Sequence, residues 1–174
     1  VLIMSWYVFH TAWGWAAILG ENKTVLGAIL PTDDPRDLYE QIQQTGLDAR
    51  FVVLPDYSLT VVNKFCAYFE GSVINDWDIE LSLDVLPPFS RKVLEFVYTI
   101  PYGENLTYGE VARAVDKPGA AQAVGQALKR NPLPLIIPCH RVVASNGPGG
   151  FTSPGGVATK LEMLQWERKN LKNY

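Results

Sequence analysis

The sequence predicts an α/β domain, a small sheet with helices, in residues 1–85, followed by a mostly helical domain with a helix-turn-helix in residues 86–174. In the first half, short segments rich in aromatic and β-branched residues alternate with segments of helical spacing. Pro87-Pro88 then breaks the chain at the point where its charge balance changes sign. In the second half, two short helical segments are joined by a turn that contains glycine.

Composition is that of an ordinary folded protein. The 174 residues are 48% hydrophobic and 19% charged, which fits one domain or two small ones. The longest apolar runs are far shorter than the roughly 20 residues that cross a bilayer, and no secretion signal opens the chain. We therefore expect an intracellular protein with no membrane partner.

The first half begins with three expected strands. Residues 6–11, 13–19 and 24–30 are rich in β-branched and aromatic side chains. They are separated by Gly14 and by a turn at residues 20–23, a pattern typical of an antiparallel meander.

Two helices and a buried strand are expected next. Asp34 before Pro35 is a helix start, so a helix is expected over residues 35–45, ended by Gly46. Residues 51–54 form a short apolar strand segment. A second helix follows, whose apolar face holds Val61, Val62, Phe65, Cys66 and Phe69. Cys66 is therefore expected to be a small buried hydrophobic residue.

The expected domain boundary coincides with a change of charge. Residues 79, 81, 83 and 85 are apolar in strict alternation, which predicts a half-buried strand before the proline pair. Residues 1–83 carry 4 Lys and Arg against 11 Asp and Glu, or −7, whereas residues 84–174 carry 11 against 7, or +4. A basic half suits a phosphate backbone, although charges spread over a solvated surface give the same balance.

The second half contains a possible DNA-binding motif. After an amphipathic helix at residues 89–100, Thr107 and Glu110 form a capping box that starts a helix running to Val115. A turn at residues 116–119 leads to another helix at residues 120–130. The pattern is that of a helix-turn-helix, although antiparallel helix pairs without a DNA function look similar.

The helix at residues 120–130 is expected to present a low outer face. Helical spacing puts Ala121, Val124, Gly125 and Leu128 on the buried stripe. The outer face then carries Gln122, Ala123, Gln126 and Arg130. Such small residues allow close approach to a narrow groove, and they equally allow close helix packing.

Cys139 is the candidate nucleophile. The apolar run at residues 133–137 is expected to be a buried extended segment that delivers Cys139 into the core, with His140 and Arg141 directly behind. A thiolate is the reactive form, so a base is required, and His140 is the base at hand. Since neighbouring side chains of an extended chain point apart, we expect a bridging water between them. Two cysteines and two histidines without CxxC or HExxH spacing predict no metal site.

These residues resemble the O6-alkylguanine-DNA alkyltransferase family over most of residues 86–171. The resemblance rests on Asn131-Pro132, residues 137–143 (Ile-Pro-Cys-His-Arg-Val-Val), Gly150-Phe151, Gly155-Gly156, Lys160 and Glu167. It implies a ribonuclease-H-like first domain and a winged helix-turn-helix second domain. It also implies direct repair, in which an alkyl group on guanine O6 is transferred irreversibly from duplex DNA to Cys139. The lesion would be flipped out of the minor groove.

The resemblance assigns catalytic roles to five residues. Cys139 accepts the alkyl group, His140 acts through water as base, and Glu167 orients and stabilises the imidazolium. Asn131 braces the backbone of the site, and Tyr108 donates to the purine ring nitrogen as the base departs. Substrate and DNA contacts are expected from Gln122, Ala123, Gln126, Arg130, Arg141, Val142, Phe151, Thr152, Ser153 and Gly155, with a structural role favoured for Arg141.

Two positions depart from the family pattern. Gln122 stands where the family inserts an arginine into the space that the flipped base leaves, which predicts a weaker wedge. Phe151 replaces a tyrosine, which keeps an aromatic wall and loses a hydroxyl. The zinc site of some relatives cannot form with the cysteines and histidines present.

The expected partner is double-stranded DNA containing O6-alkylguanine, with no cofactor and no metal. We expect a monomer in the cytoplasm, associated with the nucleoid, or in the nucleus of a eukaryote; cooperative assembly on DNA is left open. Three other classes are weighed against this one: a non-catalytic binder of alkylated DNA, a cysteine hydrolase using Cys139 and His140, and a winged-helix regulator. The presence of Cys139 disfavours the first, and the helix-turn-helix pattern disfavours the second.

Overall fold

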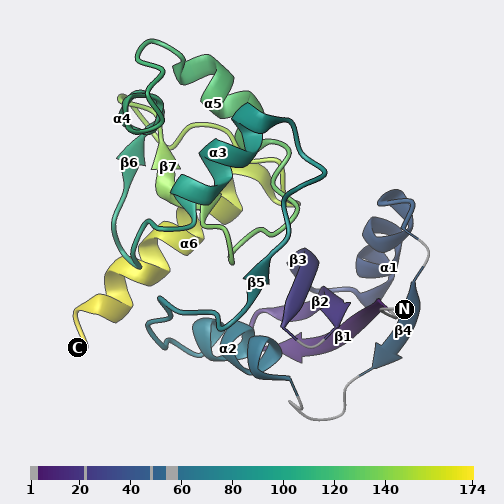
Figure 1. Ribbon diagram of the computed structural model, residues 1–174. Helices are drawn as coiled ribbons and strands as arrows, with labels where there is room; N and C mark the ends of the chain where they lie inside the picture. Colours follow the sequence, from purple (N-terminus) through teal and green to yellow (C-terminus); the bar gives the residue numbers. More distant parts are fainter. Residues whose placement is uncertain (1–3, 22, 48, 54–58) are drawn as a thin grey trace. The chain divides into compact units, whose positions relative to one another are not determined.

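The computed structural model describes residues 4–21, 23–47, 49–53 and 59–174 (Figure 1). The chain divides into two compact units, Val1–Ser82 and Leu83–Tyr174, whereas the sequence places the boundary after residue 85. The first unit is a sheet with two helices and the second is mostly helical, so the expected coarse class is confirmed. In the part of the chain that is described, no helix has the length and apolarity that a membrane crossing requires.

The first unit is built on a mixed five-stranded sheet. Its strands are β1 (Ser5–Thr11), β2 (Gly14–Glu21), β3 (Thr24–Thr32), β4 (Arg50–Val53) and β5 (Glu80–Leu81), in the order β4-β1-β2-β3-β5. β1, β2 and β3 pair antiparallel, which confirms the expected meander. β4 pairs parallel with β1, and β5 pairs parallel with β3.

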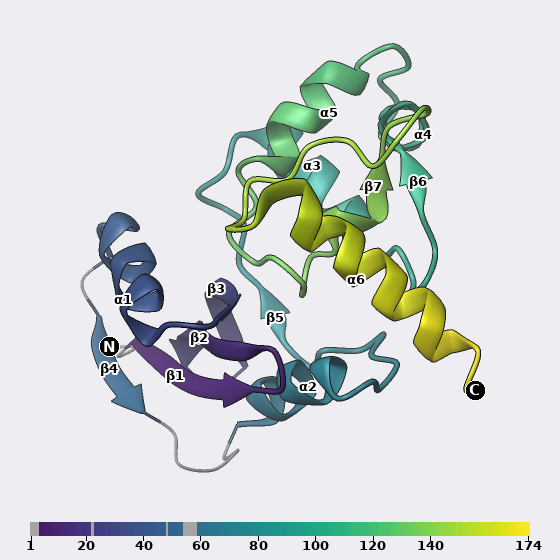
Figure 2. The same ribbon diagram turned by 180° about the vertical axis from the view of Figure 1, so that it is seen from behind.

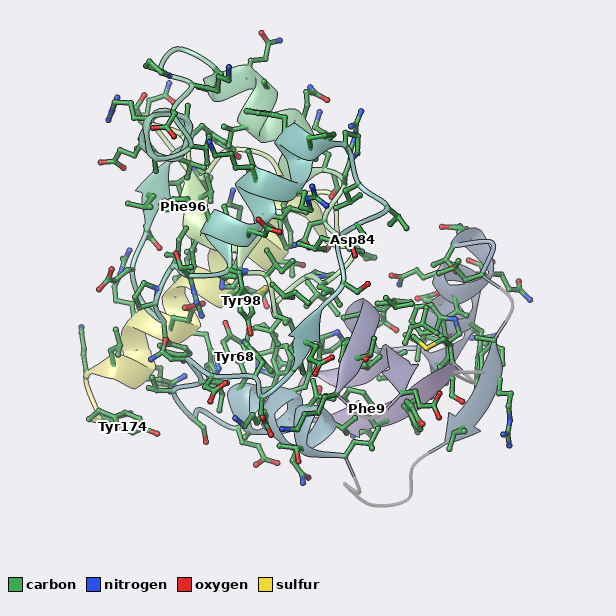
Figure 3. All side chains as sticks on the ribbon, in the orientation of Figure 1. Phe9, Tyr68, Asp84, Phe96, Tyr98 and Tyr174 are labelled. Carbon is green, nitrogen blue, oxygen red and sulfur yellow. The ribbon has the colours of Figure 1, made fainter. Side chains whose placement is uncertain are left out.

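Helices α1 (Pro35–Gln44) and α2 (Thr60–Phe69) cover opposite faces of this sheet. Leu38 of α1 packs in one apolar cluster with Trp6 and Val8 of β1. Phe9, labelled in Figure 3, has its side chain on the other face because strand residues alternate. Its ring meets that of Phe65 of α2 edge to face. As expected, Cys66 is buried on the apolar side of α2.

One expectation for the first unit differs from the structure, and two others fall partly on residues that the structure does not describe. The strand expected over residues 79–85 is wrong in length, because only β5 pairs with β3, and Val85 is 94% exposed. The alternating apolar residues at 79–85 therefore do not form a continuous run of strand pairing. The last residue of the strand expected at 51–54, and residue 22 of the expected turn, lie outside the described residues.

The second unit gathers its elements around the segment that carries Cys139. The elements are α3 (Pro88–Val97), β6 (Leu106–Thr107), α4 (Tyr108–Ala114), α5 (Ala121–Leu128), the 3₁₀ helix η1 (Cys139–Arg141), β7 (Val142–Val143) and α6 (Gly156–Leu171). β6 pairs parallel with β7, directly after η1. The long α6, the yellow helix of Figure 2, lies against η1.

The helix pair α4 and α5 forms as expected. The Thr107 hydroxyl accepts from the Glu110 backbone N–H at 3.1 Å, and a Glu110 carboxylate oxygen accepts from the Thr107 backbone N–H at 2.7 Å. The predicted capping box is therefore confirmed. In the turn, Asp116 and Gly119 both have positive φ, at 61° and 84°, which reverses the chain between the two helices.

The outer face of α5 is as expected, whereas its buried stripe is only partly so. Gln122, Ala123, Gln126 and Arg130 are all exposed. Ala127 is buried beside Val124 and Leu128, and the expected stripe leaves it out. Ala121 and Gly125 are only half-buried because they border a cavity instead of the core.

The segment at residues 133–137 is buried but not extended, so the expected conformation is wrong. The backbone N–H of Ile137 donates to the Leu133 carbonyl at 2.8 Å, and Leu135 has a φ of 73°. The chain therefore folds into a tight turn immediately before Cys139. Apolarity predicts burial here, but two prolines and a left-handed leucine set the local path.

Candidate active site

Cys139 opens η1 at the side of a cavity of about 430 Å³. Its backbone N–H donates to the Ile137 carbonyl at 2.7 Å, and its side chain is partly exposed. The cavity is walled by Tyr108 of α4, by one face of α5 and by the loop between β7 and α6. Its lining residues are Tyr108, Ala121, Gln122, Gly125, Gln126, Leu128, Lys129, Cys139, Gly150, Phe151 and Thr152.

Asn131 connects this turn to the thiol. Its side-chain oxygen accepts from the Leu133 backbone N–H at 2.9 Å. Its amide nitrogen donates to the Ile137 carbonyl at 2.9 Å and to the Cys139 sulfur at 3.1 Å. The one amide therefore bridges both ends of the turn and reaches the sulfur, the bracing position that the sequence suggests for it.

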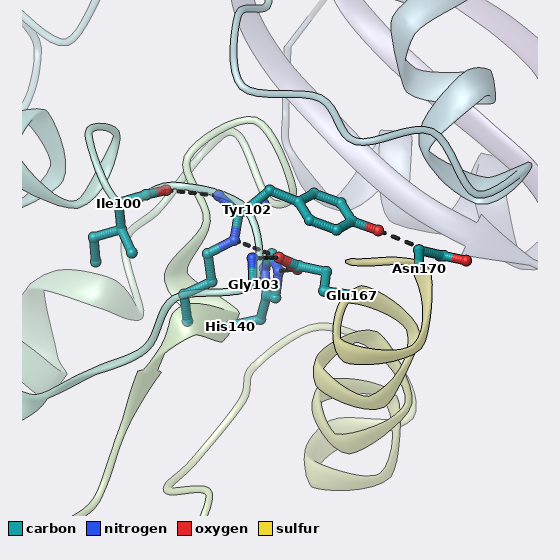
Figure 4. A network of polar contacts seen from close by, with 7 residues as sticks. Ile100, Tyr102, Gly103, His140, Glu167 and Asn170 are labelled. Atoms are coloured by element: carbon teal, nitrogen blue, oxygen red, sulfur yellow. Dashed lines mark hydrogen bonds and ion pairs between the residues drawn. The ribbon is translucent and has the colours of Figure 1, made fainter. Parts of the chain in front are cut away.

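His140, which follows Cys139 in the chain, forms a buried pair with Glu167 (Figure 4). His140 Nε2 is hydrogen-bonded to Glu167 Oε2. The other carboxylate oxygen accepts from Arg141 Nε at 2.7 Å and from the Gly103 backbone N–H at 2.9 Å. Arg141 also donates to the Ile100 carbonyl at 2.7 Å. Glu167 is thus held from three directions, which fixes the imidazole that it contacts.

The charges of this pair follow from its contacts. Burial by itself would raise the pKa of Glu167, but His140, Arg141 and the Gly103 N–H overcome it and lower that pKa to about 2. Burial lowers the pKa of His140, against the opposing effect of Glu167, so the imidazole is neutral at neutral pH. An ionised carboxylate can only accept, so the imidazole proton sits on Nε2.

This tautomer leaves His140 Nδ1 as a basic nitrogen. Nδ1 is buried and has no hydrogen-bond partner among the described residues. Burial raises the pKa of Cys139, with the Asn131 hydrogen bond and the charge of Lys160 acting in the opposite direction. The resting group is therefore a thiol, and forming the thiolate requires a proton acceptor nearby.

Lys160 is a site residue whose importance the sequence does not reveal. It lies on α6 and is 1% exposed. Its ammonium donates to the carbonyls of Val142 at 2.6 Å and Gly150 at 3.0 Å, and lies 3.5 Å from the Tyr108 hydroxyl. A lysine among small and apolar residues in a helix reads as a solvent-facing charge, and only the fold shows that it is buried.

Tyr108 is packed tightly between Lys160 and the glycine-rich loop. A Cβ on Gly149 would lie 2.4 Å from the Tyr108 hydroxyl oxygen, and Gly149 has a φ of 77°. Both facts require glycine at this position. Burial raises the pKa of the phenol, so it stays protonated at neutral pH.

Other expected contact residues divide into three groups. Gln122, Gln126, Phe151 and Thr152 line the cavity. Ala123 and Arg130 are exposed on α5 and beyond its end, while Ser153 and Gly155 form the turn that enters α6. Arg141 and Val142 are 4% and 0% exposed, which agrees with the structural role favoured for Arg141, while a DNA contact from either residue stays a prediction. Both residues are buried in the second unit, where they support the site.

Metal binding has no candidate in the described part of the chain, where no three His, Cys, Asp or Glu side chains come together in a way that could hold an ion.

Comparisons with known proteins agree on one family. The family model described as "6-O-methylguanine DNA methyltransferase, DNA binding domain" matches residues 88–169. A methylated-DNA–protein-cysteine methyltransferase of Mycobacterium leprae is 39% identical over 132 residues, which cover 74% of this chain and 78% of the relative. One of Methanocaldococcus jannaschii is 48% identical over 96 residues, and this match spans only 54% of the relative's length.

A solved structure of the Mycobacterium tuberculosis protein OGT in complex with DNA is similar over nearly the whole fold. It aligns with a TM-score of 0.74 at 27% identity, covering 95% of this chain and 94% of that chain. The chain belongs to the methylated-DNA–protein-cysteine methyltransferase family.

Proposed function

We propose that this protein repairs O6-alkylguanine in duplex DNA by moving the alkyl group irreversibly to the sulfur of Cys139. The observation that carries the proposal is the arrangement around that sulfur: a thiol facing a cavity, touched by Asn131 and backed by a neutral His140 that Glu167 orients. A nucleophile, a base and an orienting carboxylate are the parts that covalent transfer needs.

Thiolate formation is assigned to His140. Nδ1 takes the Cys139 proton through a bridging water, and the ionised Glu167 stabilises the imidazolium that results. Asn131 donates a hydrogen bond to the sulfur, an interaction that strengthens as the sulfur becomes an anion. The thiolate then attacks the alkyl carbon, and the bond from that carbon to guanine O6 breaks.

Departure of the purine is assigned to Tyr108. Its hydroxyl lies at the wall of the cavity, and its raised pKa keeps the proton available for a ring nitrogen of the leaving base. Phe151 supplies an aromatic wall for the purine face, while Thr152 and the loop backbone border the same space. Because the thioether is not reversed, one molecule repairs one lesion.

DNA binding is assigned to the helix-turn-helix of α4 and α5, as part of a winged second domain. The exposed side chains of α5 are small or neutral at Gln122, Ala123 and Gln126, which favours insertion into the minor groove. The similar M. tuberculosis protein has been solved with DNA. Since the sulfur faces a cavity instead of the outer surface, the base must leave the stack and enter that cavity.

The same proposal covers the roles of the two units, the oligomeric state and the location of the protein. The first unit is a ribonuclease-H-like partner of the reactive unit, and the division of roles is residues 1–85 for support and 86–174 for DNA binding and transfer. The protein is a monomer that acts without a cofactor, in the cytoplasm with the nucleoid or in a eukaryotic nucleus, and cooperative assembly on DNA is left open.

The proposal is tested by weighing the intact protein after incubation with a duplex that contains one O6-methylguanine. We expect the mass to rise by one methyl in exchange for a hydrogen, and Cys139→Ser to show no change. Unchanged wild-type mass with retained lesion binding would instead identify a non-catalytic binder. Regeneration of free thiol over many cycles would identify a hydrolase.

A further inference from the structure

The turn that precedes β6 holds Glu167 from one side. The Glu104 backbone N–H donates to the Pro101 carbonyl at 3.1 Å, which closes the turn. Gly103 has a φ of 79°, whereas Tyr102 does not have a positive φ. This is the pattern of a type II turn, whose third residue is glycine because its φ is positive. The Gly103 N–H donates to Glu167 Oε1 at 2.9 Å, so the turn delivers one backbone donor to this buried carboxylate.

Tyr102, the second residue of this turn, contacts two neighbours of Glu167. Its ring lies against the guanidinium of Arg141, whose Cζ is 5.5 Å from the ring centre, within the range of a cation–π interaction. Its hydroxyl accepts from the Asn170 side-chain amide at 3.3 Å (Figure 4). Asn170 is buried and lies one helical turn after Glu167 on α6. One side chain thus touches both the arginine that donates to Glu167 and the helix that carries Glu167.

The turn also packs closely against α6. A Cβ on Gly103 would lie 2.0 Å from a methyl carbon of Leu171, so the backbone of the turn lies directly against the helix. The hydrogen bond from Asn170 to Tyr102 adds a second tie close by. Turn and helix are therefore joined at three positions of α6, Glu167, Asn170 and Leu171.

The two carboxylate oxygens of Glu167 have different partners. Oε1 accepts from Arg141 Nε and from the Gly103 N–H, whereas Oε2 meets His140 Nε2. The terminal torsion of a glutamate is broad, so a carboxylate that lost its Oε1 partners could rotate and move Oε2 away from the imidazole. His140 could then carry its proton on either nitrogen, because the tautomer is set by the hydrogen bond that one nitrogen makes.

We propose that Tyr102 is a positioning residue for the transfer of the alkyl group. It keeps Arg141 and the Gly103 N–H on Oε1 of Glu167. Oε2 then stays on His140, and Nδ1 remains the basic nitrogen. This inference rests on the proposed function, because it concerns the base assigned there. Tyr102 is not one of the described residues that line the cavity, so its effect on the sulfur passes through Glu167 and His140.

Two variants of Tyr102 remove different parts of this contact. Tyr102→Leu removes the ring and the hydroxyl, whereas Tyr102→Phe removes the hydroxyl alone. Tyr39→Leu, at an exposed tyrosine of α1, is the matched control. The rate is that of single-turnover methylation of Cys139 by a duplex containing O6-methylguanine, followed by intact mass.

The two variants should differ in their loss of rate. Tyr102→Leu should be slower than wild type by about 10- to 100-fold, because a displacement of about 1 Å in a reacting group can cost about 100-fold. Tyr102→Phe should lose about 2- to 10-fold, the scale of one hydrogen bond. Tyr39→Leu should match wild type. Wild-type rates in both Tyr102 variants would overturn the inference.

A His140→Ala background separates positioning from general support of the fold. If Tyr102 acts through His140, Tyr102→Leu should add little further loss of rate in a protein that already lacks the imidazole. Equal fold losses in the two backgrounds would show that Tyr102 supports the site in another way, which overturns the inference. Tyr102→Phe gives the same comparison if Tyr102→Leu does not fold.

Nitrogen NMR of protein labelled at histidine reads the tautomer of His140 without DNA. The chain has two histidines, so His10→Ala assigns both signals. Wild-type His140 should carry its proton on Nε2 alone, whereas both tautomers should be populated in the Tyr102 variants, more evenly in Tyr102→Leu. A single unchanged tautomer in these variants would contradict the inference. If wild-type protein gains no methyl group, the proposed function fails, and the spectrum still decides whether Tyr102 positions His140.

Discussion

The Asn131 amide nitrogen lies 3.1 Å from the Cys139 sulfur while the same side chain holds both ends of the turn that precedes it. One residue therefore sets the position of the nucleophile and donates to it. Because the turn has a left-handed leucine at Leu135, it depends on such a tie to keep its shape.

Asn131→Ala should reduce both stability and transfer. The substitution leaves the Leu133 N–H without its partner, at a cost of about 1–3 kcal/mol for a buried group, and removes one of the two donors to the Ile137 carbonyl, which keeps the Cys139 N–H. The free energy of unfolding from urea titration and the single-turnover rate measure the two effects. Asn105→Ala, at an exposed site, is the control and should change neither. Normal transfer by Asn131→Ala would contradict the role given to this amide.

Gly149→Ala should slow transfer by displacing Tyr108. The new Cβ would lie 2.4 Å from the phenol oxygen, and the positive φ adds strain of about 1–2 kcal/mol. A shift of about 1 Å in a reacting group can cost about 100-fold in rate. Gly147→Ala in the same loop meets nothing within 4 Å and should retain the wild-type rate. Equal rates for the two variants would show that Tyr108 needs no fixed position.

His140→Ala should lower the transfer rate by about 100-fold or more, with little change in affinity for lesion-bearing DNA. The imidazole is buried, so it acts on the sulfur and does not touch the duplex. Single-turnover kinetics and equilibrium binding to the same duplex separate the two quantities. His10→Ala, the other histidine of the chain, is the control. Equal losses of rate and affinity would rule out the role of base.

Acid should destabilise the protein through His140 and Glu167. The pKa of His140 is lower in the folded state than its ordinary value of 6.5, so folding loses stability as pH falls below 6.5. Glu167 has a folded pKa of about 2 against 4.5, so its contribution is complete above 4.5 and is lost as pH falls toward 2.

Urea unfolding of wild type and Glu167→Gln at a series of pH values checks this assignment. The difference in free energy of unfolding between the two proteins should shrink as pH falls from about 4.5 toward 2. A difference that stays constant over that range would mean that Glu167 is not the ionised partner of His140 and Arg141.

Gln122→Arg should speed repair in duplex DNA. Gln122 lines the cavity and is exposed on α5, so a longer cationic side chain there can fill the space of a flipped base. The single-turnover rate on a methylated duplex should rise, whereas the rate with the free base O6-benzylguanine should not rise. Gln165→Arg adds the same charge to the exposed side of α6 as a control. An unchanged duplex rate would remove the wedge interpretation.

Local signals in the sequence predicted much of this molecule. The capping box of Thr107 and Glu110, the meander, and the burial of Cys66 all depend on neighbouring residues alone, and all are confirmed. The positions of α4 and α5 could be predicted for the same reason. The buried residues of α5 were predicted only in part, because side-chain exposure depends on what packs against each helix.

Long-range contacts explain what the sequence missed. The Gly103 N–H lies 64 residues from Glu167, and Lys160 lies 52 residues from Tyr108, so no spacing rule connects either pair. The alternation at residues 79–85 failed because strand length depends on the partner strand. The apolar run before Cys139 failed because apolarity predicts burial and leaves conformation open.

The most direct measurement of the central claim is a titration of lesions against protein. A fixed amount of protein is mixed with increasing amounts of duplex containing O6-methylguanine, and repaired guanine and Cys139-methylated peptide are counted. Repair should reach a plateau at one lesion per protein molecule, with the methyl group on Cys139. Continued repair beyond that ratio, or a methyl group on any other residue, would contradict it.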